Sequence, residues 1–489
     1  MRIVRLDLLR GLALAALLVT ACSGPAAPAN PTTAPSAPKP TAAPAAAAAP
    51  TTAPAAAPTA PPKPATAPTT APAAAPTTAP AAAAQAHVKI RATIWVAQAE
   101  QDALDKMVAE YQKTQPNVEV EWINITGGGL YGRDKLQTML AGGDAPDLMM
   151  LNTGQFEGLA ARGVLRAVDD FIASDKLDTS LYWPQGMEGV KYNGKTFGLP
   201  RDLSDVMLYY NKDLFDAAKV AYPNDNWTWN DLRDAAKKLT RDKDGTGKIN
   251  QWGFGVGNYT WAWTGFIWGN GGDVLSADRK QCVIDQPKSV DAMKFYFGLL
   301  TDDKVSPPPG ALPEQASVLD YFTTQSIAMG LYGPWFRPVL VNAGNQFKWD
   351  VAQPPKSPTT GQRASVVYTD EWGIYAQSKV ARETWDLMKF LTGPQGQARW
   401  NELIGARSIS PIKAVAQSDT WIHYGGSSGQ LILDTLALSK APPVNFGNAN
   451  EAETAWTEEL GLVIAGQEPI DVALKNVCAK VGPVLQQSP

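Results

Sequence analysis

The 489-residue chain has few of the side chains that most often hold metals or attack substrates, with only two histidines and three cysteines. It carries no Walker A string, no dinucleotide-binding fingerprint and no Cys/His metal cluster. From residue 87 onward there are eight more acidic than basic residues, so this part of the chain lacks a net basic charge. Both nucleic acid and an anionic membrane surface require a basic face, and the sequence argues against either as the partner of the folded part.

The first 86 residues lack what a hydrophobic core requires. The segment Ser23–Ala86 contains 29 Ala, 17 Pro and 11 Thr, with no aromatic residue and no Leu, Ile or Val. Such a composition has nothing to bury, so residues 23–86 are predicted to be a disordered Ala/Pro/Thr tether. The residues after it leave room for about two domains of ordinary size.

The N-terminus reads as an export signal. A basic stretch, Met1–Arg10, precedes the apolar run Gly11–Val19, which is too short to span a bilayer comfortably. The string Val19-Thr20-Ala21-Cys22 resembles the lipobox of bacterial lipoproteins, in which the cysteine is diacylated. Residues 1–22 are therefore interpreted as a lipoprotein signal that anchors the protein through Cys22 to the outer face of a bacterial membrane, with a plain signal peptide as the alternative.

The other two cysteines, Cys282 and Cys478, form an even pair in an oxidising compartment. They are either a disulfide or two buried free thiols, and the sequence alone does not show that they meet.

Strand and helix signals alternate after residue 87, which is typical of β-α-β units with a parallel sheet and helices on both faces. Ligands in such sheets lie beyond the carboxyl ends of strands, here residues 95–98 and 152–155. The predicted elements of this first block are strand Lys89–Val96, helix Asp102–Lys113, strand Val118–Ile123, helix Tyr131–Ala141, strand Asp147–Leu151 and helix Phe156–Arg162.

A second α/β block follows Gly198, with a strand over Val206–Tyr210 and helices over Trp229–Leu239 and Ser289–Leu300. Thr228 is the expected N-cap of the first of these helices, with Asp231 near position N3. The segments Thr369–Ala376 and Glu383–Leu391 predict a return to the first type of unit. One lobe is expected from residues 87–197 plus about 367–405, and the other from 198–366 plus about 406–489, with a cleft between them.

Several strings together resemble the family 1 extracellular solute-binding proteins, which are carbohydrate receptors of ABC importers. The resemblance is colinear from about Lys89 to the C-terminus. It implies a type II periplasmic-binding-protein fold, in which two α/β lobes are joined by crossing hinge strands. The sequence departs from the family pattern at Gln325, where glycine is usual, and at Met207, where a small residue is common. The strings are Gly142–Asp147 (GGDAPD), Leu208–Phe215 (LYYNKDLF), Thr228–Leu232 (TWNDL), Asn270–Gly272 (NGG) and Ala328–Trp335 (AMGLYGPW).

Aromatic residues provide an independent reason to expect a sugar ligand. A pyranose has an apolar face and a rim of hydroxyls, so its site needs flat aromatic surfaces beside polar groups. Tyr259, Trp261 and Trp263 crowd one segment, and by resemblance Trp335 corresponds to a tryptophan that stacks in the cleft. Packing in a core is the alternative for each ring.

Polar and aromatic residues at strand ends and crossovers complete the predicted binding site. Asp202 and Glu371 would each accept hydrogen bonds from adjacent hydroxyls, while Arg201 or Arg407 would donate a fork of bonds to oxygens. The expected ligand contacts besides the four aromatic residues above are Trp95, Gln98, Asn152, Gln155, Arg201, Asp202, Asp370, Glu371, Trp372 and Arg407.

One loop matches part of a calcium-binding pattern. Asp242, Asp244, Thr246, Lys248 and Asn250 occupy the positions of a calcium loop, but its twelfth position is Gly253 instead of a bidentate glutamate. The sequence therefore predicts at most a weak structural Ca²⁺ site, with a structural hairpin as the alternative. No other cofactor is expected.

Two features of the sequence could indicate an enzyme, but the residues around them weaken both interpretations. The string Gly425–Gly429 (GGSSG) fits G-x-S-x-G, with His423 nearby, but the segment before it is too short and polar for a nucleophile elbow. Asp370 and Glu371 are adjacent in a predicted strand and should point to opposite faces, which weakens them as a catalytic carboxyl couple.

The sequence thus predicts a non-enzymatic, monomeric, lipid-anchored extracytoplasmic receptor that delivers a mono- or oligosaccharide to the membrane permease subunits of an ABC importer. A secreted carbohydrate-active hydrolase and a receptor for a non-sugar solute are the alternatives.

Overall fold

The computed structural model describes residues 87–128, 130–311, 318–344, 346–442 and 449–486. The predicted signal, the lipobox cysteine Cys22 and the tether 23–86 lie outside the described residues. The predictions for these segments are therefore not tested by the structure. Within the described part of the chain, no helix is both long and apolar enough to cross a membrane.

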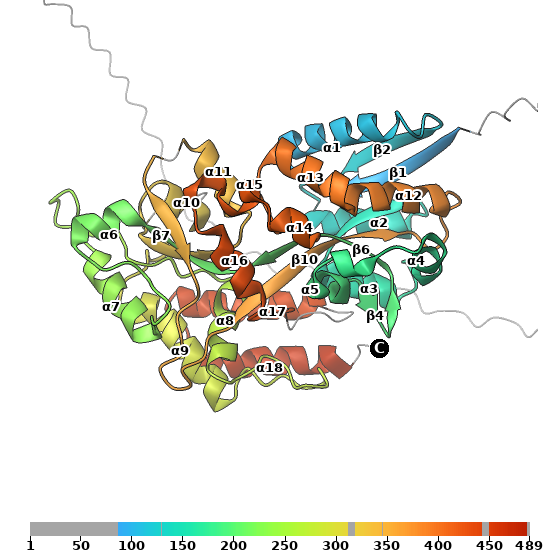
Figure 1. The fold of residues 1–489 in the computed structure, drawn as a ribbon. Helices are drawn as coiled ribbons and strands as arrows, with labels where there is room; N and C mark the ends of the chain where they lie inside the picture. The colour runs from blue at the N-terminus through green and yellow to red at the C-terminus, as the bar shows by residue number, and fades with distance from the viewer. Residues whose placement is uncertain (1–86, 129, 312–317, 345, 443–448, 487–489) are drawn as a thin grey trace, which may run out of the picture. The chain divides into compact units, whose positions relative to one another are not determined.

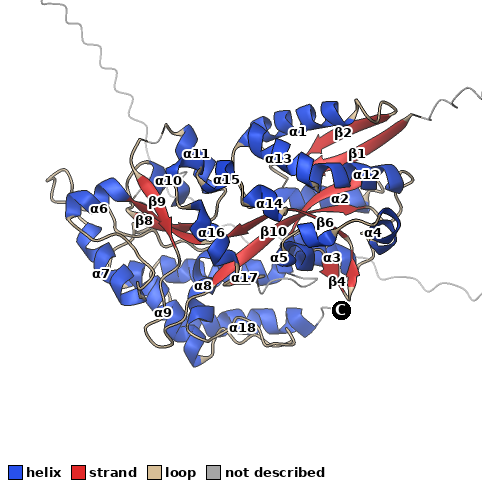
Figure 2. Ribbon diagram, in the orientation of Figure 1, coloured by secondary structure: helices blue, strands red, loops and turns tan. Residues whose placement is uncertain are grey.

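The first lobe is built on a sheet whose order is β11-β10-β3-β1-β2. Figures 1 and 2 label β1, β2 and β10 of this sheet. Strands β1 (Val88–Ile94), β2 (Val118–Asn124) and β3 (Leu148–Asn152) are parallel, as the β-α-β pattern predicts. Helices α1 (Gln98–Tyr111), α2 (Arg133–Ala141) and α3 (Thr153–Ala161) connect and follow them. The carboxyl ends of these strands meet at one edge of the sheet, which is where this fold class places ligands.

Alternation along β3 shows how the sheet is covered. Leu148 and Met150 pack with residues of α1, α12 (Ala381–Thr392) and α13 (Pro394–Ile404), whereas Met149 and Leu151 pack with residues of α2 and α3. Successive strand residues face opposite sides, so both faces of the sheet are buried under helices.

Two long strands cross between the lobes. β6 (Gly198–Asp205) pairs antiparallel with β10 (Ser365–Ile374), which also pairs antiparallel with β3. The β6–β10 register shifts by a bulge between Asp370 and Glu371. The predicted return to the first type of unit is confirmed in that β10 joins the first-lobe sheet beside β3 and is followed by α12 (Ala381–Thr392). Its direction differs from that of the parallel strands, because the chain enters β10 from the second lobe and therefore runs against β3.

The second lobe contains a three-stranded antiparallel sheet, with β7 (Met207–Asn211) between β8 (Met329–Tyr332) and β9 (Trp349–Ala352). Its largest apolar cluster includes residues of α7 (Trp229–Leu239), α8 (Thr260–Gly269), α9 (Pro287–Thr301), α17 (Ala449–Ile464) and α18 (Ile470–Gln486). A further cluster includes residues of α10 (Val318–Thr323), α11 (Phe336–Asn342) and α16 (Gly429–Leu436).

The remaining elements are short. They are η1 (Leu130–Gly132), α4 (Asp169–Asp175), η2 (Thr179–Leu181), α5 (Pro184–Gly189), β4 (Lys191–Tyr192), β5 (Lys195–Thr196), α6 (Lys212–Ala218), α14 (Lys413–Ala416), α15 (Asp419–Ile422), η3 (Tyr424–Gly426) and β11 (Ser439–Lys440).

Local chemistry explains where α7 begins. The Thr228 side chain accepts a hydrogen bond from the Asp231 amide, and the Asp231 carboxylate accepts one from the Thr228 amide at 2.8 Å. This capping box satisfies two amides at the helix start that have no intrahelical acceptor. The predicted bounds and N-cap of this helix are confirmed.

Gln325 occupies a position that favours glycine. It lies in the turn before β8 with a φ of 58°, in the left-handed region where a side chain is disfavoured. Its side chain accepts only a long hydrogen bond, 3.4 Å from the Asn211 amide nitrogen. The departure from the family pattern therefore falls where the backbone conformation makes glycine the less strained residue.

Replacing Gln325 with glycine should relieve this strain. We expect Gln325→Gly to raise the free energy of unfolding by about 0.5–1 kcal/mol, measured by urea denaturation. The neighbouring substitution Thr324→Gly, at a residue whose φ is not positive, should lower it. A lower stability of Gln325→Gly than of the wild type would contradict the assignment of strain.

Candidate functional site

A cavity of about 450 Å³ lies between the two lobes. The crossing strands β6 and β10 contribute to it, together with the β1–α1 connection, the start of α3, the start of α8 and the α17 helix. Its walls are formed by Trp95, Tyr131, Arg133, Asn152, Gly154, Gln155, Asp202, Ser204, Asn258, Tyr259, Thr260, Trp261, Trp263, Trp335, Tyr368, Asp370, Arg407, Glu453, Trp456 and Thr457.

Most of the predicted ligand contacts are brought together in this cavity, although they are spread over more than three hundred positions of the sequence. The predicted residues on its walls are Trp95, Asn152, Gln155, Asp202, Tyr259, Trp261, Trp263, Trp335, Asp370 and Arg407.

Four predicted residues do not line the cavity. Gln98 is exposed at the start of α1 and donates to Asp102 Oδ1 at 2.8 Å. Glu371 is fully buried and accepts a hydrogen bond from the Thr369 hydroxyl. Trp372 is buried in the first-lobe core, with its ring centroid 6.1 Å from that of Trp122. Asp370 faces the cavity while Glu371 does not, which agrees with the expectation that adjacent strand residues point to opposite faces.

The fourth of these residues, Arg201, lies buried beside the cavity and holds two of its carboxyl groups. Its Nη1 donates to Asp202 Oδ2, and it lies 3.4 Å from Asp370 Oδ2. Asp202 on β6 and Asp370 on β10 are cross-strand partners, so the sheet register places their carboxyl groups side by side. The guanidinium also lies 5.2 Å from the centre of the Trp400 ring. Arg201 is thus a positioning residue that orients both carboxyl groups toward the cavity.

Burial and crowding alter the proton affinity of Asp370. Burial of Asp370, with the nearby charge of Asp202, raises the pKa of Asp370 well above its usual range, and Arg201 and Arg407 oppose this only in part. Asp370 therefore keeps its proton to a higher pH than a free carboxyl does. In that form it donates a hydrogen bond, while an ionised neighbour accepts them.

One wall of the cavity is aromatic. The rings of Tyr259 and Trp261 stack with centroids 4.9 Å apart and an interplanar angle of 10°. Trp335 meets Trp261 edge to face at 5.9 Å. A Cβ on Gly333 would fall 1.8 Å from the Trp335 ring, so glycine at that position is what allows the ring to occupy this place.

The first lobe contributes its own aromatic pair. Trp95 donates from Nε1 to the carbonyl oxygen of Met150 at 3.2 Å, and its ring lies 4.9 Å from that of Tyr131. Tyr131 has a φ of 54°, a strained conformation for a residue with a side chain. Trp263 differs from the others, because it is fully buried and packs edge to face on Trp456 at 6.1 Å. Trp263 therefore belongs mainly to the core beneath the cavity.

Several cavity residues were missed by the sequence reasoning. Tyr131 follows the carboxyl end of β2 in a glycine-rich connection, and the strand-end rule applied to the other strands would have found it. Glu453, Trp456 and Thr457 lie on α17, and no local signal connects that helix to residues several hundred positions earlier. The missed residues are Tyr131, Arg133, Gly154, Ser204, Asn258, Thr260, Tyr368, Glu453, Trp456 and Thr457.

The calcium-like loop is held by its own hydrogen bonds. The Asp242 carboxylate accepts from the amides of Asp244 at 3.2 Å and Gly247 at 2.5 Å, and Asn250 Nδ2 donates to Asp244 Oδ2 at 2.6 Å. An ion at this loop would compete with these bonds. Elsewhere too, no group of three or more His, Cys, Asp or Glu side chains among the described residues is placed to hold a metal ion.

The serine string does not form a nucleophile elbow. Ser427 follows the short helix η3, whereas an elbow requires a strand, and its hydroxyl donates to the Tyr424 carbonyl at 3.0 Å. His423 Nδ1 contacts the Asp419 carbonyl oxygen at 3.2 Å.

Comparisons with known proteins agree with this geometry. The sequence model of the family described as bacterial extracellular solute-binding protein matches residues 97–398. A solved ABC substrate-binding protein from Listeria monocytogenes, in complex with cycloalternan, is 28% identical with a TM-score of 0.74 and covers 82% of this chain and 99% of its own. A maltose/maltodextrin-binding domain from Bdellovibrio bacteriovorus, bound to maltotriose, is 20% identical with a TM-score of 0.68 and covers 82% and 100%. A Brucella abortus protein named as a binding protein is 24% identical over 364 residues, 72% of this chain and 83% of its own.

The raised pKa of Asp370 leads to a prediction about pH. An acid whose pKa is raised by folding contributes stability that is present below its unfolded pKa and is lost as the pH rises through the folded pKa. The substitution Asp370→Asn removes the titrating carboxyl group and keeps a side chain of the same shape as the neutral carboxyl. Its stability relative to the wild type should therefore improve as the pH rises from about 4, the unfolded pKa of Asp, toward 8, measured by urea denaturation at each pH.

Burial also raises the pKa of Asp205 and of Glu371. Asp205 cancels in the difference between the two proteins. The charge of Asp370 adds to the raised pKa of Glu371, so the substitution lowers that pKa as well and changes the stability difference in the same direction. A stability difference that stays constant across this pH range would contradict the assignment to Asp370.

Proposed function

Because the chain belongs to the bacterial extracellular solute-binding protein family, we propose that it is the extracytoplasmic receptor of an ABC importer and captures a mono- or oligosaccharide between its lobes. The observation that carries this proposal is that one cavity contains both an aromatic surface and a pair of carboxyl groups. The aromatic wall of Tyr259, Trp261 and Trp335 stands beside the carboxyl pair of Asp202 and Asp370.

These two surfaces match the two chemical faces of a sugar. The C–H face of a pyranose packs on flat rings, and its hydroxyl rim requires donors and acceptors. The Asp202–Asp370 pair supplies both when it holds one proton, and Asn152, Gln155 and Arg407 add amide and guanidinium groups. Arg133 and Arg407 share the cavity wall with three carboxyl groups and offset two of their charges, so a cationic solute such as a polyamine meets little net negative charge there.

The ligands of similar proteins support the same class of solute. The Listeria protein, 28% identical, binds cycloalternan, and the Bdellovibrio domain of the same fold binds maltotriose. Both are oligosaccharides built from hexose rings. These proteins are receptors, which favours capture of the sugar over its hydrolysis.

The proposed mechanism is a shift between open and closed forms. A sugar that touches Trp95 and Asn152 of the first lobe and Trp261 and Trp335 of the second makes all of these contacts only when the lobes are closed. Its binding therefore favours the closed form, which the permease subunits recognise. Hydrolysis of ATP belongs to a separate importer subunit.

The proposal includes how the receptor is held at the membrane. Diacylation at Cys22 would anchor the chain to the outer face of the membrane, and the tether 23–86 would let the receptor work away from it. The receptor acts as a monomer without a cofactor, and any Ca²⁺ at Asp242 and Asp244 would be a weak structural ion.

A ligand screen tests the proposed function. The full chain is titrated with maltotriose, mannotriose and cycloalternan, with spermidine and a tripeptide as controls, while its melting temperature is recorded. A ligand at one hundred times its Kd stabilises the folded state by about 2.7 kcal/mol, which is visible in a melt. Stabilisation by a control solute alone, or turnover of the bound sugar at catalytic rates, would contradict the proposal.

The aromatic wall gives a sharper prediction. Trp335→Ala removes a stacking surface and should weaken sugar binding about tenfold or more by isothermal titration calorimetry. Trp335→Phe retains a flat ring and should lose much less. Equal affinities of the wild type and Trp335→Ala, with both proteins folded, would remove Trp335 from the binding site.

A further inference from the structure

The second lobe contacts the first through an ion pair outside the cavity walls. We propose that Arg279 and Glu157 form a latch across the cleft, which the Cys282–Cys478 disulfide holds in position and which favours the closed form of the receptor. The inference rests on the proposed function, in which closure over the ligand is the working step. It adds a positioning role for residues that do not touch the ligand.

The latch joins elements of different lobes. Arg279 Nη1 donates to both carboxylate oxygens of Glu157, at 3.4 and 3.3 Å. Glu157 lies on α3, the helix whose first turn places Gly154 and Gln155 on the cavity wall. A force that draws α3 toward the second lobe therefore acts on the same rigid element that carries ligand-facing residues.

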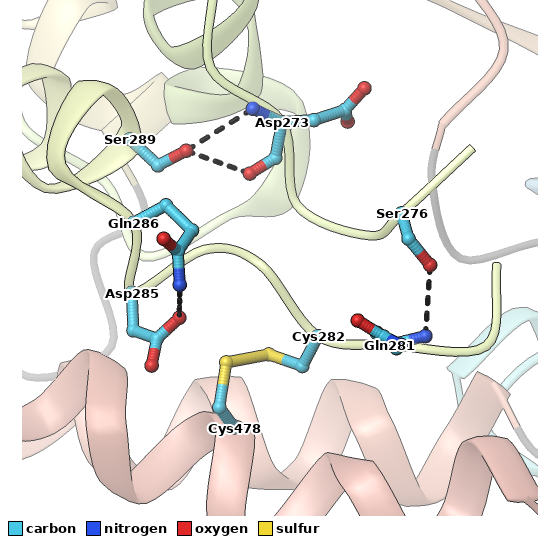
Figure 3. Close-up of a disulfide and its surroundings, with 8 residues drawn as sticks. All are labelled: Asp273, Ser276, Gln281, Cys282, Asp285, Gln286, Ser289 and Cys478. Carbon is cyan, nitrogen blue, oxygen red and sulfur yellow. Dashed lines mark hydrogen bonds between the residues drawn. A yellow bond between two sulfur atoms is a disulfide. The ribbon is translucent and has the colours of Figure 1, made fainter. Parts of the chain in front are cut away.

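Arg279 is presented by a tight hairpin in the second lobe. The Val283 amide donates to the Val274 carbonyl at 2.9 Å, and Leu275 forms an antiparallel bridge with Cys282. At the tip, the Gln281 amide donates to the Ser276 hydroxyl at 2.9 Å, as Figure 3 shows. These bonds give the hairpin a defined shape but do not by themselves attach its tip to the rest of the lobe.

Attachment comes from α18. The disulfide joins Cys282, in the hairpin three residues after Arg279, to Cys478 on that helix (Figure 3). Near the end of the same helix, Gln486 Nε2 donates to the Lys280 carbonyl at 3.0 Å. The tip that carries Arg279 is thus fixed to α18 at two points, Lys280 and Cys282, which both follow Arg279 within three residues. This placement gives the disulfide a consequence at the cleft in addition to closing a long loop.

A second ion pair bridges the lobes nearby. Arg133 at the start of α2 lies 3.9 Å from Glu453 on α17, and both residues line the cavity. Arg133 and Glu453 face the ligand, so their substitution would change binding directly. The pair of Glu157 and Arg279 lies outside the cavity walls. Its substitution therefore changes the closure of the lobes without removing a residue that contacts the ligand.

The expected effect is modest, because both side chains are partly exposed, Glu157 by 24% and Arg279 by 47%. Ion pairs in such positions change an equilibrium constant by about two- to fivefold, and added salt weakens them further. Closure is linked to binding, so the same factor should appear in the Kd for a sugar.

The latch is tested by a double-mutant cycle on the full chain. Arg279→Gln and Glu157→Gln should each raise the Kd for the sugar found in the screen by about two- to fivefold, and the double variant should lose no more than one of them. Exchanging the charges, Glu157→Arg with Arg279→Glu, should restore the affinity. Lys280→Gln is the matched control, because it removes a neighbouring exposed charge and should leave the Kd unchanged.

The disulfide is tested in the same assay. Cys282→Ser with Cys478→Ser should raise the Kd to the same extent, and Arg279→Gln should add nothing in that background. Loss of the disulfide also removes the closure of a loop with a sequence separation of 196, which can destabilise the whole fold, so folding is checked first by circular dichroism. If that variant does not fold, the cycle between Arg279 and Glu157 still decides the question.

A second measurement needs no ligand. Spin labels on noncanonical residues at exposed Lys195 and Lys238, one in each lobe, report the distance between the lobes. The latch variants should shift this distribution to longer distances, and Lys280→Gln should not. Distributions and Kd values that match the wild type in all latch variants would overturn the proposal. Absence of sugar binding by the wild type would instead overturn the proposed function, and the distance measurement would still judge the latch.

Discussion

The antiparallel pairing of β6 with β10 is the constraint on which the rest of the site depends. These two strands cross between the lobes, so the hinge and the base of the cavity are the same piece of sheet. Their register places Asp202 opposite Asp370, and the bulge after Asp370 changes the pairing before the strand enters the first-lobe core. A slip of one residue would turn both carboxyl groups away from the cavity.

That arrangement brings two acidic groups into a buried place, which is costly unless a cation or a shared proton compensates. Arg201 supplies the cation, and the raised pKa of Asp370 shows that compensation is incomplete without the proton. Buried carboxyl groups whose charge is only partly compensated are well suited to hydroxyl ligands, because a hydroxyl both donates and accepts hydrogen bonds. The aromatic residues that line the same cavity explain why a sugar, with one apolar face, fits better than a wholly polar solute.

Much of the fold was predictable because the sequence carries local signals for it. The β-α-β pattern identified the parallel strands, and Thr228 with Asp231 identified the start of α7. The direction of β10 was not predictable from local pattern, because it depends on which lobe the chain comes from.

Residues next to strand ends, such as Trp95 and Asn152, were found by the general rule for α/β sheets. Glu453 and Trp456 were missed because a helix late in the chain reaches the cavity only through tertiary packing. Gln98, Glu371 and Trp372 show the opposite error, since closeness in sequence to a cavity residue does not fix the face to which a side chain points.

A crystal structure of the receptor with the sugar found by the melting screen would show whether one solute contacts both the aromatic wall and the carboxyl pair. We expect a pyranose ring packed on Trp261 or Trp335, with hydroxyls bonded to Asp202 and Asp370 and contacts to both lobes. A sugar bound elsewhere on the protein, or one that touches a single lobe only, would contradict the proposed site.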